Sequence, residues 1–354
     1  MTTADRELSP LPSVLVLVEN ESVPVDTRVW AECRTLARAG FDVVAVCPQG
    51  KDWDRAPFER RDGIEIHRFP LRYAGGPLGY AVEYASAFRH MWRLSRRLSR
   101  NRTFTVVHVA NPPDFLLLAA WPLRRRGARL VFDQHDLVPE LCLSRFGHPG
   151  RALVPAAQLL ERMAFSLADV VIAVNESHRA VAMTRGAKNA EDVFVVRNGP
   201  DLSLFHPQPQ DPDLKRGKPH LIGYVGLMEP QDGVEHGVRA LALLHRRRQD
   251  WHAVFVGSGS ELPRLEALGR ELGVADALEF TGFVERSQVV RTLASCDVCL
   301  APEPLTPYND ASTMIKIAEY MAMSLPIVAF DLKESRFSAN GAAVLAPLRR
   351  EDGR

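Results

Sequence analysis

Apolar runs of strand length alternate with segments of helical period along most of the chain. Strands are predicted in the first part at 13–18, 42–47, 64–69, 105–110, 129–132, 170–174 and 193–196. In the second part they are predicted at 221–225, 252–256, 278–281, 298–301, 327–330 and 343–345. Helical segments at 26–39, 80–100, 114–126, 234–248, 261–272 and 287–294 lie between them. This alternation predicts an α/β protein with parallel sheets and right-handed crossovers.

A segment without periodicity separates the two series of strands. Residues 200–219 (PDLSLFHPQPQDPDLKRGKP) are rich in proline and charge, which is typical of a linker. We therefore predict domains at 1–199 and 220–354, joined by a linker at 200–219. Asp211-Pro212-Asp213 matches a metal-binding D-x-D pattern, but no strand precedes it, which favours the linker interpretation.

Composition limits the classes of function. Hydrophobic residues at 46% and charged residues at 25% are ordinary for a soluble globular protein. Lys+Arg 44 against Asp+Glu 43 gives no bias toward nucleic acid. The amino-terminal residues lack the pattern of a signal peptide, and no apolar run has membrane-spanning length. The expected location is therefore the cytoplasm.

Five scattered cysteines favour reduced thiols over a disulfide framework. Cys296 and Cys299 form a C-x-x-C pair, which permits a zinc or redox site. No second pair accompanies them and Cys299 falls in a predicted strand, so buried free thiols are the favoured interpretation.

Glycine turns follow several predicted strands. Gly226, Gly257 and Gly259 come directly after apolar runs, where glycine permits close approach of a ligand to the backbone or merely an entry into a helix. The loop after the first strand has no G-x-G-x-x-G fingerprint, which argues against a classical dehydrogenase.

The stretch 309–331 (NDASTMIKIAEYMAMSLPIVAFD) carries the most chemistry. Asn309, Asp310, Ser312 and Thr313 offer N-cap side chains for one helix, whose inward face is predicted at 314, 315, 318 and 321. The amino end of a helix suits a phosphate, and Lys316 adds a positive charge there. Glu319 can accept hydrogen bonds from sugar hydroxyls. The alternative is an exposed Lys–Glu pair at i,i+3 on a solvated helix.

Two further features leave alternatives open. The predicted helix at 80–100 carries several arginines interleaved with apolar residues, so it suits either an anionic membrane surface or a solvated outer face. The cluster Asp133-Gln134-His135-Asp136 follows a strand, where α/β proteins place their sites. Adjacent side chains give poor geometry for a single metal ion, so a metal is not expected there.

The motif SxxxKxxEYMAxxxPIV, from Ser312 to Val328, is similar to the donor-site motif of family 4 glycosyltransferases. The resemblance extends over nearly the whole chain and is closest to a capsule and exopolysaccharide branch of that family. The other matching segments are 26–32, 36–48, 133–140, 175–177, 195–199, 224–226, 231–233, 309–314 and 330–332.

The resemblance implies the GT-B fold, two Rossmann-like domains with parallel sheets facing across a cleft. It implies transfer of a sugar from a nucleoside diphosphate sugar to a glycan or lipid-linked acceptor, with retention at the anomeric carbon. No cofactor or metal is implied, because helix dipoles and basic side chains stabilise the leaving diphosphate. A lipid-linked acceptor implies contact with the inner face of the cell membrane.

The resemblance also implies roles for residues. The candidate catalytic residues are His135, Asp136 and Arg28. The candidate donor-binding residues are Gly226, Gly257, Gly259, Asp310, Ser312, Thr313, Met314, Lys316 and Glu319, with the phosphates on Lys316 and the ribose on Glu319. Asp26, Glu140, Arg197 and Asn198 are the other candidate residues of the cleft.

The chain departs from the family pattern in three places. Ala311 stands where many members have a first glutamate, and Leu227 and Asp232 stand where many have a basic pair. The sequence ends at Arg354, whereas family members usually continue with further helices. A catalytically weak or truncated scaffold and a nucleotide-sugar epimerase of the same fold are therefore the alternative functions.

Overall fold

The computed structural model describes residues 12–50, 54–71 and 76–347. It divides into two compact units. Within the described residues, the first unit comprises those up to Pro139 together with Leu153–Val196. The second comprises Glu140–Ala152 and those from Arg197 onward. Each unit is an α/β domain built on its own sheet.

The sheet of the first unit has the order β3-β4-β2-β1-β5-β6-β7-β8. Its strands are β1 (Ser13–Leu17), β2 (Asp42–Pro48), β3 (Phe58–Arg61), β4 (Ile64–Phe69), β5 (Val106–Ala110), β6 (Arg129–Gln134), β7 (Val170–Ala173) and β8 (Val193–Val195). All neighbours pair in parallel except β3, which lies antiparallel to β4 at the edge. The strand order reverses between β1 and β5, and such a reversal is where doubly wound sheets hold their ligands.

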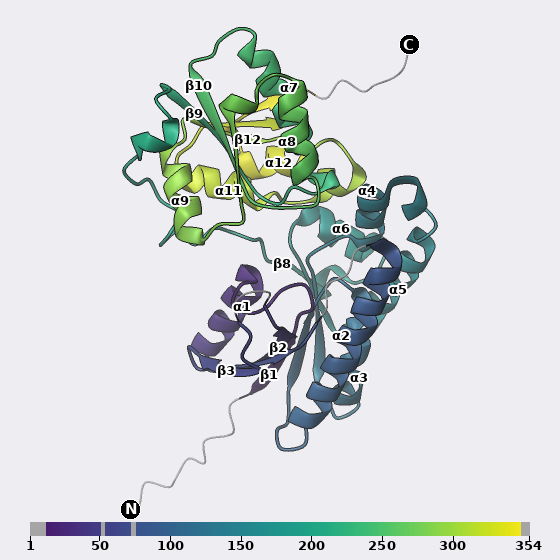
Figure 1. Ribbon diagram of the computed structural model, residues 1–354. Coiled ribbons are helices and arrows are strands. Elements are labelled where there is room, and N and C mark those ends of the chain that lie inside the picture. The colour runs from purple at the N-terminus through teal and green to yellow at the C-terminus, as the bar shows by residue number, and fades with distance from the viewer. Residues whose placement is uncertain (1–11, 51–53, 72–75, 348–354) are drawn as a thin grey trace, which may run out of the picture. The chain divides into compact units, whose positions relative to one another are not determined.

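Helices cover both faces of this sheet. They are α1 (Thr27–Arg38), α2 (Gly76–Leu98), α3 (Leu117–Arg124), α5 (Val154–Leu167) and α6 (Glu176–Thr184), with short 3-10 turns η1 (Asp114–Leu116) and η2 (Ala190–Asp192). Val14 and Val16 pack in one core with α1, whereas Leu15 and Leu17 pack in the other with α2 and α3. Figure 1 shows α1 on one side of the strands and α2 and α3 on the other. Helix α4 (Val138–Gly150) leads from the first unit into the second.

The sheet of the second unit has the order β11-β10-β9-β12-β13-β14, entirely parallel. Its strands are β9 (His220–Val225), β10 (Trp251–Val256), β11 (Leu278–Gly282), β12 (Val298–Ala301), β13 (Ile327–Phe330) and β14 (Ala343–Ala346). This is the doubly wound order 3-2-1-4-5-6, and its reversal lies between β9 and β12. The loops that follow these two strands are therefore the expected place for a ligand.

The helices of the second unit again form two layers. They are α7 (Val234–His245), α8 (Leu262–Glu271), α9 (Arg286–Ser295), α10 (Pro307–Ala311), α11 (Ile315–Ala322) and α12 (Lys333–Ala339), with 3-10 turns η3 (Pro212–Lys215), η4 (Pro230–Asp232) and η5 (Ala275–Ala277). α7 and α8 lie side by side over one face (Figure 1), while α9, α11 and α12 pack in the core of the other. Phe205, from the predicted linker, is buried in that second core.

The predicted strands agree with the structure to within one or two residues, but some elements were missed. β3 (FERR) has exposed or half-buried side chains and carries no apolar alternation that would reveal it. Helices α4, α5, α6 and α12 were not predicted; in α4, Pro139, Gly147 and Pro149 interrupt the helical pattern. Strand β6 continues to Gln134, so Asp133 lies in the strand and is fully buried.

The prediction of one long capped helix after residue 309 is wrong. Thr306 caps a short helix α10, since the Asn309 N–H donates to its hydroxyl at 3.0 Å and Pro307 occupies the first turn. Helix α11 begins only at Ile315, after Met314, and has no side-chain cap. The prediction of the inward face is wrong for Ile315 and Met321, although Met314 packs against the core. Ile317 and Tyr320 are buried, whereas Ile315 and Met321 are each 38% exposed, so the inward face lies about two residues further along.

The interpretation of Cys296 and Cys299 as buried free thiols is confirmed, and Cys296 donates to the carbonyl of Thr292. Within the described residues, no helix combines the length and apolar character needed to cross a membrane. The arginines of α2 at 89, 93, 96 and 97 are exposed. This exposure fits both interpretations of that helix.

Candidate functional site

Two clusters of charged side chains lie at the carboxyl ends of the strands, one in each unit. The first surrounds Asp133 in the first unit, and the second surrounds Lys316 in the second unit.

Asp133 is held by a guanidinium from helix α1. The carboxylate of Asp26 accepts the N–H of Val29 at 3.0 Å and so caps this helix, which places Arg28 in the first turn. Arg28 Nη2 lies 2.7 Å from Asp133 Oδ1 and Nε lies 3.3 Å from Oδ2. Arg28 Nη1 also donates to the carbonyl of Val196 at 2.8 Å. Arg28 therefore contacts the 133–136 segment directly.

Two histidines share the same carboxylate. His135 Nε2 lies 2.6 Å from Asp133 Oδ2, and His108 Nε2, from β5, lies 3.2 Å from it. Burial alone would raise the pKa of Asp133, but the charge of His135 and the hydrogen bonds from both histidines hold that pKa well below its usual value. Burial alone would lower the pKa of His135, but the charge of Asp133 raises it to about 9.

His135 is therefore an imidazolium at neutral pH. Its Nε2–H donates to Asp133, so Arg28 Nε, 3.1 Å from the same nitrogen, cannot also donate there and repels it. Within the described part of the chain, Nδ1 of His135 makes no hydrogen bond. The side chain is 15% exposed. His135 thus offers one charged N–H donor to a ligand.

Glu32 completes the cluster. Its carboxylate lies 3.2 Å from Arg28 and 3.4 Å from His108, and burial followed by the charge of Asp133 raises its pKa to about 7. Glu32, Asp133 and His135 place possible ligand atoms within 4.8 Å of one another, which is close enough for a metal ion. Arg28 already contacts all three, however, so a divalent ion would meet a fixed positive charge. These residues therefore suit a charge network better than a metal site.

Asn111 is a residue that the sequence analysis missed. It follows β5, and its amide oxygen accepts the N–H groups of His135 at 2.6 Å and Asp136 at 3.0 Å. Its amide nitrogen donates to the Asp136 carbonyl at 2.8 Å and to Asp114 at 2.7 Å. Asn111 thus fixes the backbone turn that carries His135. Its position directly after a predicted strand was the sequence feature that could have revealed Asn111 as a site residue.

The other candidates of this group lie in different surroundings. Asp136 contributes backbone groups to the Asn111 network. Glu140 lies in the first turn of α4, in the second unit. Arg197 also belongs to the second unit, 3.6 Å from Glu334 and stacked 4.2 Å from the ring centre of Phe337. Asn198 follows it in the segment after β8.

In the second unit, Lys316 lies where the strand order reverses. Its Nζ is ion-paired with Glu303, in the loop after β12, and donates to Tyr224 Oη at 3.1 Å. Tyr224 Oη in turn donates to the carbonyl of Leu227 at 2.6 Å. The Lys316 side chain is 9% exposed. The alternative interpretation of Lys316 and Glu319 as an exposed surface pair is therefore wrong.

Burial and neighbouring charges together shift the pKa values in this cluster. Burial alone would lower the pKa of Lys316, but Glu303, Tyr224 and Asp232 raise it, so the ammonium stays charged. Burial raises the pKa of Asp232 to about 6, with Lys316 acting in the opposite direction. Burial also raises the pKa of Glu319, which Arg286 and Lys316 partly offset.

Three candidate glycines are explained by packing within this unit. A Cβ at Gly257, where φ is 135°, would lie 1.9 Å from the Gly226 carbonyl oxygen, and one at Gly259 would lie 2.3 Å from the Met228 carbonyl oxygen. At Gly226 a Cβ would lie 2.9 Å from Lys316 Nζ. The loops after β9 and β10 thus pack backbone to backbone, and Gly226 leaves the space that the ammonium occupies.

The remaining donor-site candidates flank α10 and α11. Asp310 accepts the backbone N–H of Lys333 at 2.7 Å, and the Ser312 hydroxyl donates to the Tyr308 carbonyl at 2.7 Å. These two side chains therefore stabilise local structure. Thr313 and Met314 precede α11, whose first N–H groups have no side-chain cap. This uncapped end is the feature that suits an anion.

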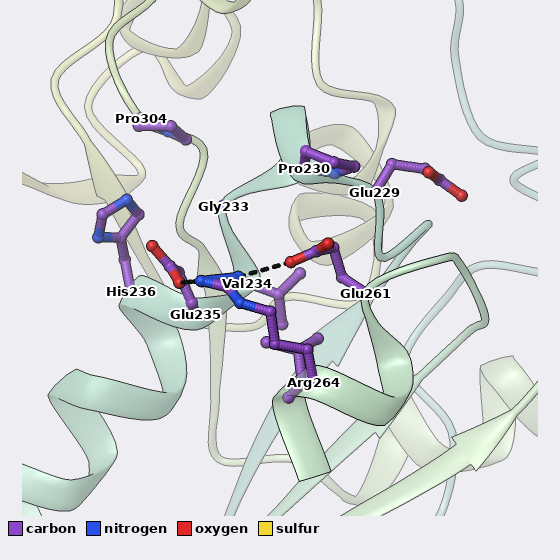
Figure 2. A pocket seen from close by; sticks show the side chains of 10 residues that line it. Glu229, Pro230, Gly233, Val234, Glu235, His236, Glu261, Arg264 and Pro304 are labelled. Carbon is purple, nitrogen blue, oxygen red and sulfur yellow. Dashed lines mark hydrogen bonds and ion pairs between the residues drawn. The ribbon is translucent and has the colours of Figure 1, made fainter. Parts of the chain in front are cut away.

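Figure 2 shows a separate pocket of about 240 Å³ in this unit, beside η4 and the amino ends of α7 and α8. Glu229, Glu235 and Glu261 contribute to its lining, together with His236 and Arg264. Arg264 pairs with Glu261 at 2.5 Å and with Glu235. Three carboxylates against one arginine do not favour a phosphate in this pocket.

Two Rossmann-like domains, each with a charged cluster at the carboxyl edge of a parallel sheet, define the GT-B class of fold. Residues 25–199 match the family described as "Glycosyl transferase 4-like domain", and residues 219–352 match "Glycosyl transferases group 1". The chain therefore belongs to the GT-B glycosyltransferases of family 4.

Curated relatives include the Alpha-D-kanosaminyltransferase of Streptomyces kanamyceticus, 31% identical over 32% of this chain and 28% of that protein. The uncharacterized glycosyltransferase YqgM of Bacillus subtilis is 25% identical over 61% of this chain and 56% of that protein. A GDP-mannose-dependent mannosyltransferase of Mycolicibacterium smegmatis, acting on phosphatidylinositol monomannoside, is 28% identical over 59% of this chain and 53% of that protein. The alignments with these three relatives thus span between about a quarter and somewhat over half of their lengths.

Solved structures share the fold over most of the chain. The sucrose-phosphate synthase of Thermosynechococcus elongatus superposes with a TM-score of 0.75 at 18% identity, covering 95% of this chain and 86% of that one. The Anabaena protein HepE, solved in complex with UDP-glucose, gives a TM-score of 0.64 at 19% identity, covering 92% and 82%. These similarities establish the GT-B fold.

Proposed function

We propose that this protein transfers a sugar from a nucleoside diphosphate sugar to a glycan or lipid-linked acceptor. The observation that carries the proposal is the position of the uncapped amino end of α11. It precedes Lys316 and Glu319 where the strand order of the second unit reverses. Related folds bind the same class of ligand, since HepE was solved with UDP-glucose.

Residues of both charged clusters have separate roles in this proposal. The N–H groups at the amino end of α11 and the ammonium of Lys316 receive the diphosphate, so the negative charge that develops on the leaving group is stabilised without a metal. Glu319 accepts hydrogen bonds from the ribose. His135 donates its Nδ1–H to the transferred sugar. Asp133 keeps the imidazolium charged and oriented, and Arg28 holds the Asp133 carboxylate in place. We assign retention of anomeric configuration and a role in cell-surface polysaccharide synthesis from the family resemblance.

A panel of nucleotide sugars tests this function. The protein is incubated with each donor, with and without a lipid extract as acceptor source, and the products are resolved by mass spectrometry and NMR. Transfer or slow donor hydrolysis to the nucleoside diphosphate supports the proposal. An epimerised donor would instead indicate an epimerase, and binding without turnover would indicate a scaffold.

Glu319→Gln is expected to weaken nucleotide binding by about 1–3 kcal/mol, the range for a lost charge-assisted hydrogen bond. Isothermal titration with a panel of nucleoside diphosphates measures the change. Glu266→Gln, an exposed glutamate of α8, removes the same charge and should leave affinity unchanged. Equal affinity of Glu319→Gln and the parent, with unchanged circular dichroism, would remove Glu319 from the donor site.

A lipid-linked acceptor requires contact with the membrane surface, and α2 offers the charge for it. Arg93, Arg96 and Arg97 are exposed, and Arg96 lies 4.6 Å from the ring centre of Trp92. Each basic residue near an anionic surface contributes about 1 kcal/mol. We therefore expect sedimentation with anionic liposomes at low salt and release at high salt.

The triple variant Arg93→Glu, Arg96→Glu and Arg97→Glu should abolish sedimentation and spare nucleotide binding. Its control reverses three exposed arginines of the second unit, Arg246, Arg247 and Arg270, and so changes the net charge equally. If the α2 variant sediments like the parent, α2 is a solvated outer face.

A further inference from the structure

We propose that Glu303 is a positioning residue that competes with the donor's diphosphate for Lys316, and thereby sets how tightly the donor binds. The inference rests on the proposed function in that it takes the anion at α11 to be a diphosphate. It adds a residue outside the motif that suggested the donor site, in the loop after β12.

The contacts of Lys316 leave it only partly available. The hydroxyl hydrogen of Tyr224 is used on the Leu227 carbonyl, so this oxygen must accept from Lys316. A second hydrogen of the ammonium goes to Glu303 Oε1. One N–H therefore remains, on an ammonium that lies against the Cα of Gly226 and 4.5 Å from the ring centre of Tyr224.

The charge of Lys316 is also neutralised before any ligand arrives. Glu303 is only 1% exposed, so solvent screens the pair weakly. Asp232 adds further negative charge beside the ammonium. A diphosphate entering this cluster meets a lysine that is already paired and carboxylates that repel it, so Glu303 must weaken anion binding.

In the part of the chain that the structure describes, Lys316 is the side-chain partner of Glu303 and no other could replace it. Within the described residues, its second oxygen, Oε2, is buried and makes no hydrogen bond. A diphosphate that draws the ammonium away would leave a buried unpaired carboxylate, which is costly. The same carboxylate orients the ammonium toward the loop at 226–228 in the free protein. Glu303 therefore lowers the affinity for the donor, but it holds the Lys316 ammonium in a fixed orientation before the donor binds.

The test is isothermal titration of the full chain with inorganic pyrophosphate at one fixed pH. Glu303→Gln keeps an oxygen that can accept from Lys316 but removes the competing charge, so it should tighten pyrophosphate binding roughly tenfold. Glu279→Gln, which removes one charge beside Arg216 on the edge strand β11, should leave the affinity unchanged. Adding Lys316→Met to Glu303→Gln should abolish the gain.

An equal or weaker affinity in Glu303→Gln would overturn the proposal, and so would a gain that persists in the Lys316→Met background. If Glu303→Gln does not fold, Glu303→Asp keeps the charge but withdraws the carboxylate. It should then tighten binding by a smaller factor, and an unchanged affinity would refute the competition. Pyrophosphate binding does not depend on sugar transfer, so failure of the nucleotide-sugar panel and failure of this test are separate results.

Discussion

Replacing His135 with alanine is expected to lower turnover by roughly 10²- to 10³-fold, the usual cost of removing one donor that stabilises developing charge. Asp133 keeps His135 protonated up to a pKa of about 9, so its Nδ1–H is a charged donor throughout the neutral range. An interaction made mainly in the transition state lowers kcat and kcat/KM together. Nucleotide affinity, measured separately by titration, should change little.

Exposed His220→Ala in the second unit provides the control, since it removes an imidazole far along the chain from the Asp133 cluster. Its turnover should match that of the parent. A similar loss of turnover and of nucleotide affinity in His135→Ala would mean that His135 supports the fold instead of the reaction.

Asp133→Ala is expected to destabilise the first unit by about 3–5 kcal/mol, because it leaves buried positive charge without a counter-ion. Arg28, His108 and His135 all lie within 3.3 Å of this carboxylate. Urea unfolding followed by circular dichroism measures the change. Adding Arg28→Met to Asp133→Ala should recover part of the loss, since it removes one of the stranded charges. If the losses in free energy of unfolding caused by Asp133→Ala and Arg28→Met simply add in the double variant, the charge network is contradicted.

The same cluster predicts how stability depends on pH. The folded pKa of His135 is about 9 against an ordinary value of 6.5, so its contribution is complete below pH 6.5 and is lost as the pH rises through 9. The folded pKa of Asp133 is depressed, so its contribution is lost as the pH falls through that low value. In Asp133→Ala the loss of stability between pH 6.5 and 9 should largely disappear.

The sequence predicted the sheets well because buried parallel strands leave continuous apolar runs, as in 13–18 and 252–256. It failed at β3, where an edge strand has no buried face, and at 306–315, where one helix was predicted and the structure has the two helices α10 and α11. The inward face of α11 was misjudged for a related reason. Tyr320 is fully buried with its hydroxyl bonded to Val225 N and Leu300 O, which a hydrophobic pattern does not register.

The candidate site was predictable in its residue types but not in its partners. The polar segment after β6 and the Lys–Glu motif of α11 were visible in the sequence, and the structure brings Arg28 to His135 and Gly226 to Lys316. Asn111 and Glu303 were not predicted, because each acts through a residue distant in sequence. Only the strand order reveals that the loops after β9 and β12 are neighbours.

Hydrogen–deuterium exchange with and without nucleotide sugar tests most directly whether the donor lies on the second unit. Each donor from the panel is added at a concentration that is just sufficient to saturate the parent protein, and protection is mapped by mass spectrometry. The account predicts slowed exchange in the amides at 313–315 and in the loop at 226–228, with loss of this protection in Glu319→Gln. Protection confined to the first unit, or protection at 226–228 and 313–315 that Glu319→Gln leaves intact, would contradict it.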